Sequence, residues 1–111
     1  MKVFPDFIGE DSEGRHGYEV KTSFSWRTGL LGRSYERSAA EGMRQVESGI
    51  LRRFSIVIVL GSDLGKAGVA VEQLEAFRQR LEVLAHNYPG LTMSVGVLIE
   101  LKFHHLFDVG S

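Results

Sequence analysis

The chain has 111 residues, of which 43% are hydrophobic and 24% charged, so it is long enough for one folded domain and too apolar for a disordered chain. It contains no cysteine, which excludes disulfide bonds and thiolate metal sites. No apolar run is long enough to cross a bilayer and the first residues lack a signal-peptide pattern, so we expect no membrane partner and a cytoplasmic location.

The N-terminal part of the chain predicts a β-hairpin followed by a helix. Residues 2–9 and 16–24 have strand-like patterns and are joined by the polar connection 10–14, which ends in Gly14. Residues 25–33 show no clear period and are expected to form a loop. Ser34 offers a helix N-cap, and apolar residues then recur at steps of three and four as far as Phe54, which predicts an amphipathic helix.

The second half predicts two further strands around a second helix. The continuous apolar run 54–60 is typical of a central, parallel strand that is covered on both faces. Residues 61–68 read as a loop, residues 69–88 as a helix that stops at Pro89-Gly90, and residues 91–101 as the last strand. The expected fold is a single α/β layered domain, residues 1–111, with a mixed central sheet in the order ββαβαβ.

The first hairpin carries the most informative side chains. Residues i and i+2 of a strand share a face, so Glu19 and Lys21 project together. Asp6 reaches the same point if the preceding strand pairs antiparallel with this one. Two carboxylates beside a lysine suit a divalent cation, because hard cations prefer oxygen ligands. The pattern therefore predicts a metal-dependent phosphodiesterase site.

Pro5-Asp6 followed by Glu19-Val20-Lys21 resembles the signature of the PD-(D/E)xK nuclease superfamily, whose fold is called restriction-endonuclease-like. The resemblance implies that Asp6 and Glu19 bind Mg²⁺ or Mn²⁺, that the backbone carbonyl of Val20 is a further ligand, and that Lys21 positions the attacking water. It also implies an endonuclease acting on nucleic acid, DNA more than RNA.

The chain departs from the family pattern before this motif. In the superfamily a helix and a strand usually precede the Pro-Asp element, whereas Met1 lies only four residues before Pro5. We expect either a reduced version of the fold or a missing layer that is supplied by a homodimer or a larger complex.

The middle of the chain is basic. Residues 15–55 carry seven arginines and one lysine against four glutamates. Since the guanidinium fork donates two parallel hydrogen bonds to phosphate, nucleic-acid contacts are predicted for Arg27, Arg33, Arg37 and Arg44. The alternative is that such arginines pair with glutamates on a solvated helix face.

Three other interpretations remain open. Glu19 and Lys21 also fit an ordinary solvated pair on a half-exposed sheet. The chain also fits a non-enzymatic interaction or regulatory protein that keeps a decayed nuclease-like fold. A third possibility is a nucleotide-binding module that uses residues 61–68, although their glycine spacing is too short for a Walker A loop.

Overall fold

The computed structural model of the chain describes residues 4–23, 31–61 and 71–110. These residues form five strands and two helices in the order ββαβαββ: β1 Phe7–Asp11, β2 Gly14–Ser23, α1 Leu31–Glu47, β3 Arg53–Leu60, α3 Val71–Asn87, β4 Thr92–Ile99 and β5 Lys102–Gly110.

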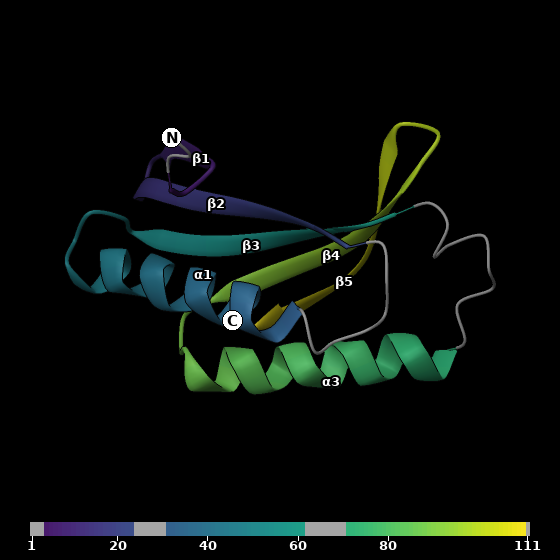
Figure 1. Ribbon diagram of the computed structural model, residues 1–111. Coiled ribbons are helices and arrows are strands. Elements are labelled where there is room, and N and C mark those ends of the chain that lie inside the picture. Colours follow the sequence, from purple (N-terminus) through teal and green to yellow (C-terminus); the bar gives the residue numbers. More distant parts are fainter. Residues whose placement is uncertain (1–3, 24–30, 62–70, 111) are drawn as a thin grey trace.

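The strands lie in the sheet in the same order as in the sequence (Figure 1). Strands β2, β3 and β4 are parallel, while β1 and β5 pair antiparallel at the two edges. The predicted α/β class and mixed sheet are confirmed, and so is the central, parallel position of β3. The restriction-endonuclease-like arrangement stays a prediction.

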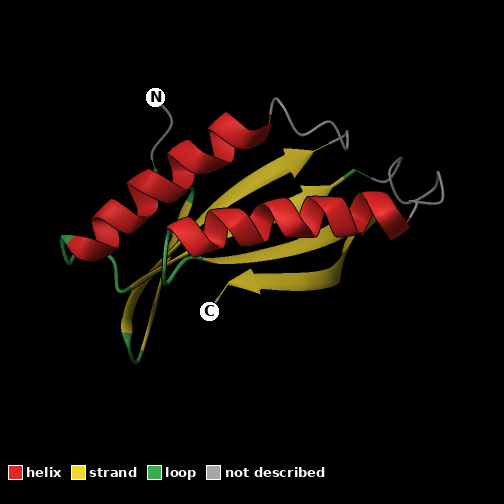
Figure 2. Cartoon of the chain, turned by 90° about the horizontal axis from the view of Figure 1, so that it is seen from below, coloured by secondary structure: helices red, strands yellow, loops and turns green. Residues whose placement is uncertain are grey.

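Both helices cover one face of the sheet (Figures 1 and 2). Right-handed crossovers between successive neighbouring strands place their helices on the same side, which explains this arrangement. On that side the β3 residues are at most 1% exposed: Phe54, Ile56, Ile58 and Leu60. Val57 and Val59, on the other side, are only half-buried. The prediction that β3 is covered on both faces is therefore wrong, because the described residues place helices on one side of the sheet only.

Helix α1 lies close against β3 at Gly42. A side chain at this glycine would overlap the ring of Phe54, so only glycine permits this spacing between helix and strand. The prediction that the helix continues to Phe54 is wrong, since α1 begins at Leu31 and ends at Glu47. Gly49 then adopts a φ of +83°, and the N–H groups of Ile50 and Leu51 donate to the carbonyl of Gln45. The apolar period continues past the helix because Leu51 and Phe54 belong to the same core.

The C-terminal residues form a hairpin that the sequence did not reveal. The predicted strand 91–101 ends at Ile99, and β5 returns along it after the turn residues Glu100 and Leu101, whose φ values are +51° and +65°. Positive φ at two successive positions is the geometry of a type I′ hairpin turn, which is normally formed by Asn-Gly. Glu-Leu gave no such signal, so the predicted order ββαβαβ lacks the last strand.

The part of the chain that the structure describes contains no helix long and apolar enough to cross a membrane.

Candidate metal centre

Strand β2 directs Glu19 and Lys21 toward the helix layer. Glu19 lies opposite Ile56 of β3, and Lys21 lies opposite Ile58. Both isoleucines are fully buried beneath the helices, and residues opposite each other in a sheet share a face. The predicted common face of the two charged residues is confirmed, and it is the buried face of the strand.

The segment before β1 folds over this same face of β2. The ring of Phe4 packs against the ring of Phe54 with centroids 5.6 Å apart. At Gly17, an added Cβ would lie 2.7 Å from Cδ1 of Leu51 and 3.0 Å from Cγ of Pro5. Gly17 thus leaves the space in which Pro5 sits on the strand, two residues before Glu19.

Hydrogen bonds join Asp6 to the Glu19 side chain and to the Val20 backbone. The backbone N–H of Asp6 donates to Oε1 of Glu19 over 3.1 Å, and the N–H of Val20 donates to Oδ2 of Asp6 over 2.9 Å. Nζ of Lys21 lies 3.8 Å from Oε2 of Glu19, which is longer than a direct hydrogen bond. The three side chains that the motif selected are therefore in one place.

Burial makes this site electrostatically costly. Only 5% of the Glu19 side chain and 18% of the Lys21 side chain are exposed. Burial raises the pKa of Glu19, and both a hydrogen bond with the Asp6 carboxyl group and the charge of Asp6 raise it further. The Asp6 N–H and the Lys21 ammonium lower this pKa by less. A cation between the two carboxyl groups would remove the repulsion.

The carbonyl of Val20 is available on the same side. The N–H and C=O of one strand residue point to the same side of the strand, so the carbonyl of Val20 is directed toward Asp6. Strand β1 pairs with β2 only as far as Tyr18, so it does not cover this edge at Val20. Among the described residues no group of three or more His, Cys, Asp or Glu could hold a metal ion. The available donors are thus two carboxyl groups and a carbonyl.

The structure does not show the predicted arginines at this site, in contrast to Asp6, Glu19 and Lys21. Arg37 and Arg44 are exposed on α1, and Nη2 of Arg44 lies 2.6 Å from Oε1 of Glu41. The alternative of a helix-surface ion pair is confirmed for Arg44. Arg33 belongs to α1 but its side chain is outside the description, and Arg27 lies outside the described residues altogether. So does the loop 61–68 beyond Gly61.

The open face of the sheet carries a polar row that the sequence analysis did not predict. Nε2 of His16 lies 2.8 Å from the hydroxyl oxygen of Ser55, which is also hydrogen-bonded to Thr92. Farther along, Oδ1 of Asp108 accepts from Ser94 and lies 2.9 Å from Nε2 of His105. Ser55, the one polar residue in the otherwise apolar run 54–60, was the available signal for this polar row.

Comparison with family models, with curated proteins and with solved structures gave no match to this chain, so the geometry of the site alone carries the functional argument.

Proposed function

We propose that this protein is a metal-dependent nuclease that hydrolyses phosphodiester bonds of nucleic acid, DNA in preference to RNA. The observation that carries the proposal is the meeting of Asp6 and Glu19 beside Lys21 on a buried strand face. The chain brings these residues together from segments 13 positions apart. An ordinary solvated Glu-Lys pair does not require a second carboxyl group or this degree of burial.

The donors fit Mg²⁺ or Mn²⁺. Mg²⁺ is usually held by one or two carboxylates plus waters and substrate phosphates, and does not need an all-protein cage. Asp6, Glu19 and the Val20 carbonyl would hold the ion. The raised pKa of Glu19 is consistent with this assignment, because burial and the neighbouring Asp6 carboxyl group disfavour the Glu19 anion by more than the Lys21 ammonium favours it.

The side chains divide the chemistry between them. A divalent ion at this site supplies Lewis-acid activation of the phosphate and of water. Lys21 reaches the edge of the site with its ammonium 3.8 Å from Glu19, a separation that leaves room for a bridging water. In our proposal Lys21 orients that water for attack and offsets the charge that develops on the phosphate.

The experiment is a cleavage assay on single- and double-stranded DNA and RNA, with and without Mg²⁺ or Mn²⁺. We expect cleavage only with the metal, and Glu19→Gln and Lys21→Ala should each lower the rate at least about a hundredfold. Circular dichroism should show that both variants keep the wild-type fold. Undiminished cleavage by either variant would contradict the assigned roles.

The second candidate is a non-enzymatic interaction protein. Its support is the hairpin β4–β5, whose tip bends away from the helix layer in Figure 1 and which exposes large apolar side chains: Leu98, Ile99, Leu101, Phe103 and Leu106. Metal-independent wild-type stability together with no cleavage of any substrate would favour this candidate.

A further inference from the structure

One face of the sheet carries no helix of the part of the chain that the structure describes (Figures 1 and 2). Residues that lie opposite each other in neighbouring strands share a face, so the strand register defines this open face. Val57 lies opposite Val20, and Val59 lies opposite Gly96. A side chain at Gly96 would overlap the ring of Phe103, which therefore lies on the open face beside Val59.

The open face has an apolar half toward the ends of β2 and β3. Five side chains form this apolar half: Val20, Val57, Val59, Leu98 and Phe103. The three valines are half-buried, Leu98 is 38% exposed and Phe103 is 44% exposed. Neighbouring apolar side chains that stay exposed on a folded chain mark an interaction surface.

The other half of the open face is polar, and its side chains are already paired. Nε2 of His16 lies 2.8 Å from the hydroxyl oxygen of Ser55, and Nε2 of His105 lies 2.9 Å from Oδ1 of Asp108. Arg53, at the start of β3, forms an ion pair with an acidic residue of the first hairpin turn. A partner can therefore cover this half without leaving these polar groups unpaired, and the pairing does not favour a strongly charged ligand.

The area of the open face is sufficient for a second copy of this chain. Strands lie about 4.8 Å apart and rise about 3.3 Å per residue, so four strands of about eight residues cover about 500 Å² in each copy. Two copies together provide about 1,000 Å², which is the smallest area expected of a specific interface. The tip of the hairpin β4–β5 bends toward the open side in Figure 1 and adds to this area.

The pattern of the face selects the orientation of the second copy. A two-fold axis parallel to the strands keeps the starts of both sets of strands at the same end, so the apolar half of one copy meets the apolar half of the other. An axis across the strands would place each apolar half on a polar half. With the parallel axis, the hairpin β4–β5 of one copy lies over β2 of the other, and the two sheets form a sandwich with the helices outside.

We propose that this protein forms a homodimer through the open face of its sheet. The apolar half forms the centre of the interface, and the polar half forms its hydrated rim. Glu19 and Lys21 lie on the other face of β2, so the dimer does not depend on the nuclease proposal. Both candidate metal centres remain on the helix side of their own copy.

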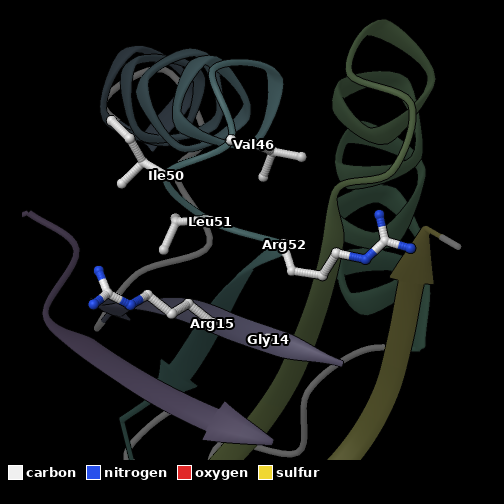
Figure 3. Close-up of a pocket in the computed structure, with 7 residues that line it drawn as sticks. Gly14, Arg15, Val46, Ile50, Leu51 and Arg52 are labelled. Carbon is white, nitrogen blue, oxygen red and sulfur yellow. The ribbon is translucent and has the colours of Figure 1, made fainter. Parts of the chain in front are cut away.

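A second exposed apolar side chain, on the helix side, provides the control. A pocket of about 500 Å³ lies between the turn of the first hairpin and the end of α1 (Figure 3). Its lining includes Arg15, Arg52, Val46 and Ile50, and Ile50 is 55% exposed. The proposed dimer leaves this pocket in solvent. Ile50 therefore tests whether any exposed apolar side chain has the same effect on assembly.

The test measures the mass of the whole chain by analytical ultracentrifugation from about 1 μM to about 1 mM. We expect the wild type to reach twice the chain mass of 12.4 kDa. Val59→Lys places a charge in the centre of the interface and should raise the dimer Kd at least about a hundredfold, and Phe103→Ser should raise it at least about tenfold. Ile50→Lys and Glu19→Gln should leave this Kd unchanged. Circular dichroism checks that each variant is folded.

Several results would overturn the dimer. One is a wild type that stays monomeric at about 1 mM. Another is a dimer that resists both Val59→Lys and Phe103→Ser, as strand pairing along a sheet edge would. If Val59→Lys does not fold, Phe103→Ser decides. An equal loss of assembly in Ile50→Lys would place the interface on the helix side, and a monomer that binds a different polypeptide through Phe103 would assign the face to that partner. A dimer that depends on Val59 but shows no metal-dependent cleavage would support the interface and contradict the nuclease alone.

Discussion

The two hairpins at the edges of the sheet hold their carboxyl groups in opposite ways. In β1–β2, Glu19 is buried against Asp6 and its pKa is raised, chiefly by burial. In β4–β5, Asp108 is exposed and its pKa is lowered by hydrogen bonds with His105 and Ser94. The first carboxyl group is destabilised as an anion and the second is stabilised. A bound cation would offset the cost of the buried Glu19 anion, whereas the Asp108 anion is already stabilised by its own hydrogen-bond partners.

The largest expected effect on the free energy of unfolding comes from a substitution at Gly17, over which Pro5 packs next to the buried pair Asp6 and Glu19. Gly17→Ala would place a methyl group against Leu51 and Pro5, so we expect a loss of about 1–3 kcal/mol in the free energy of unfolding. Urea denaturation measures this loss. Gly9→Ala is the control in the same hairpin, because its nearest neighbour, Cε2 of Tyr18, is 3.9 Å from the added atom. If the two substitutions had equal effects, the packing of Pro5 would not require the space that Gly17 leaves.

The next effect is the response to Mg²⁺. A wild-type protein that binds the ion only when folded should gain about 1.4 kcal/mol when Mg²⁺ is at ten times its Kd. Asp6→Asn should stabilise the metal-free protein or leave it unchanged, since it removes one charge from the pair, and it should abolish the gain with Mg²⁺. Thermal melting curves measure both quantities.

Asp108→Asn is the matched control for this response. The Asp108 carboxyl group already has hydrogen-bond partners and is exposed, so the variant should keep the full Mg²⁺ response. A wild type whose melting is indifferent to millimolar Mg²⁺ would count heavily against the metal site.

The pH dependence of stability should distinguish the two carboxyl groups by sign. The folded metal-free protein holds the Glu19 proton more tightly than the unfolded chain, so stability is highest below the ordinary pKa of 4.5 and falls as the pH rises through the folded-state pKa. For Asp108 the contribution is present above the ordinary pKa of 3.8 and is lost as the pH falls through its lowered pKa. Denaturation curves from about pH 3 to about pH 7 measure both trends.

Single substitutions assign these trends. Glu19→Gln should remove the loss of stability that occurs as the pH rises through the folded-state pKa of Glu19. Asp108→Asn should reduce the loss of stability that occurs as the pH falls through the lowered pKa of Asp108. If Glu19→Gln left the loss of stability at rising pH unchanged, the buried Glu19 carboxyl group would not be the cause of that loss.

The smallest effect concerns the turn of the second hairpin. Leu101 has a φ of +65° and is 93% exposed, so its side chain adds backbone strain without packing. Leu101→Gly should raise the free energy of unfolding by about 0.5 kcal/mol, since the relief of strain exceeds the added entropy of the unfolded chain. Chemical denaturation detects this gain, and a loss of stability would show that the added entropy of the unfolded chain outweighs the relief of backbone strain.

The sequence predicted the elements whose local signals agree with their tertiary surroundings. The apolar run of β3, the Pro89-Gly90 stop after α3 and the shared face of Glu19 and Lys21 all appear as expected. The strand β5 was missed because its turn is built from Glu100 and Leu101, which lack turn chemistry. The end of α1 was placed too late because the apolar period runs on into β3.

The candidate site was only partly predictable for a similar reason. Spacing on one strand selected Glu19 and Lys21, but their burial follows from α1 and from the Phe4–Asp6 segment, which no local pattern indicates. The role of Gly17 depends on its contact with Leu51, a residue 34 positions away in the chain. The pocket at Arg15 and Arg52 likewise joins segments that meet only in the folded sheet.

The order of the strands in the sheet has a consequence for synthesis of the chain. Each strand lies beside the one made before it, so the sheet grows at one edge as residues emerge, and N-terminal segments can fold first. Every contact named here for the metal centre lies within residues 4–60. The residues of the candidate site therefore come from the part of the chain that is made first, while the hairpin of exposed apolar residues comes from the part that is made later.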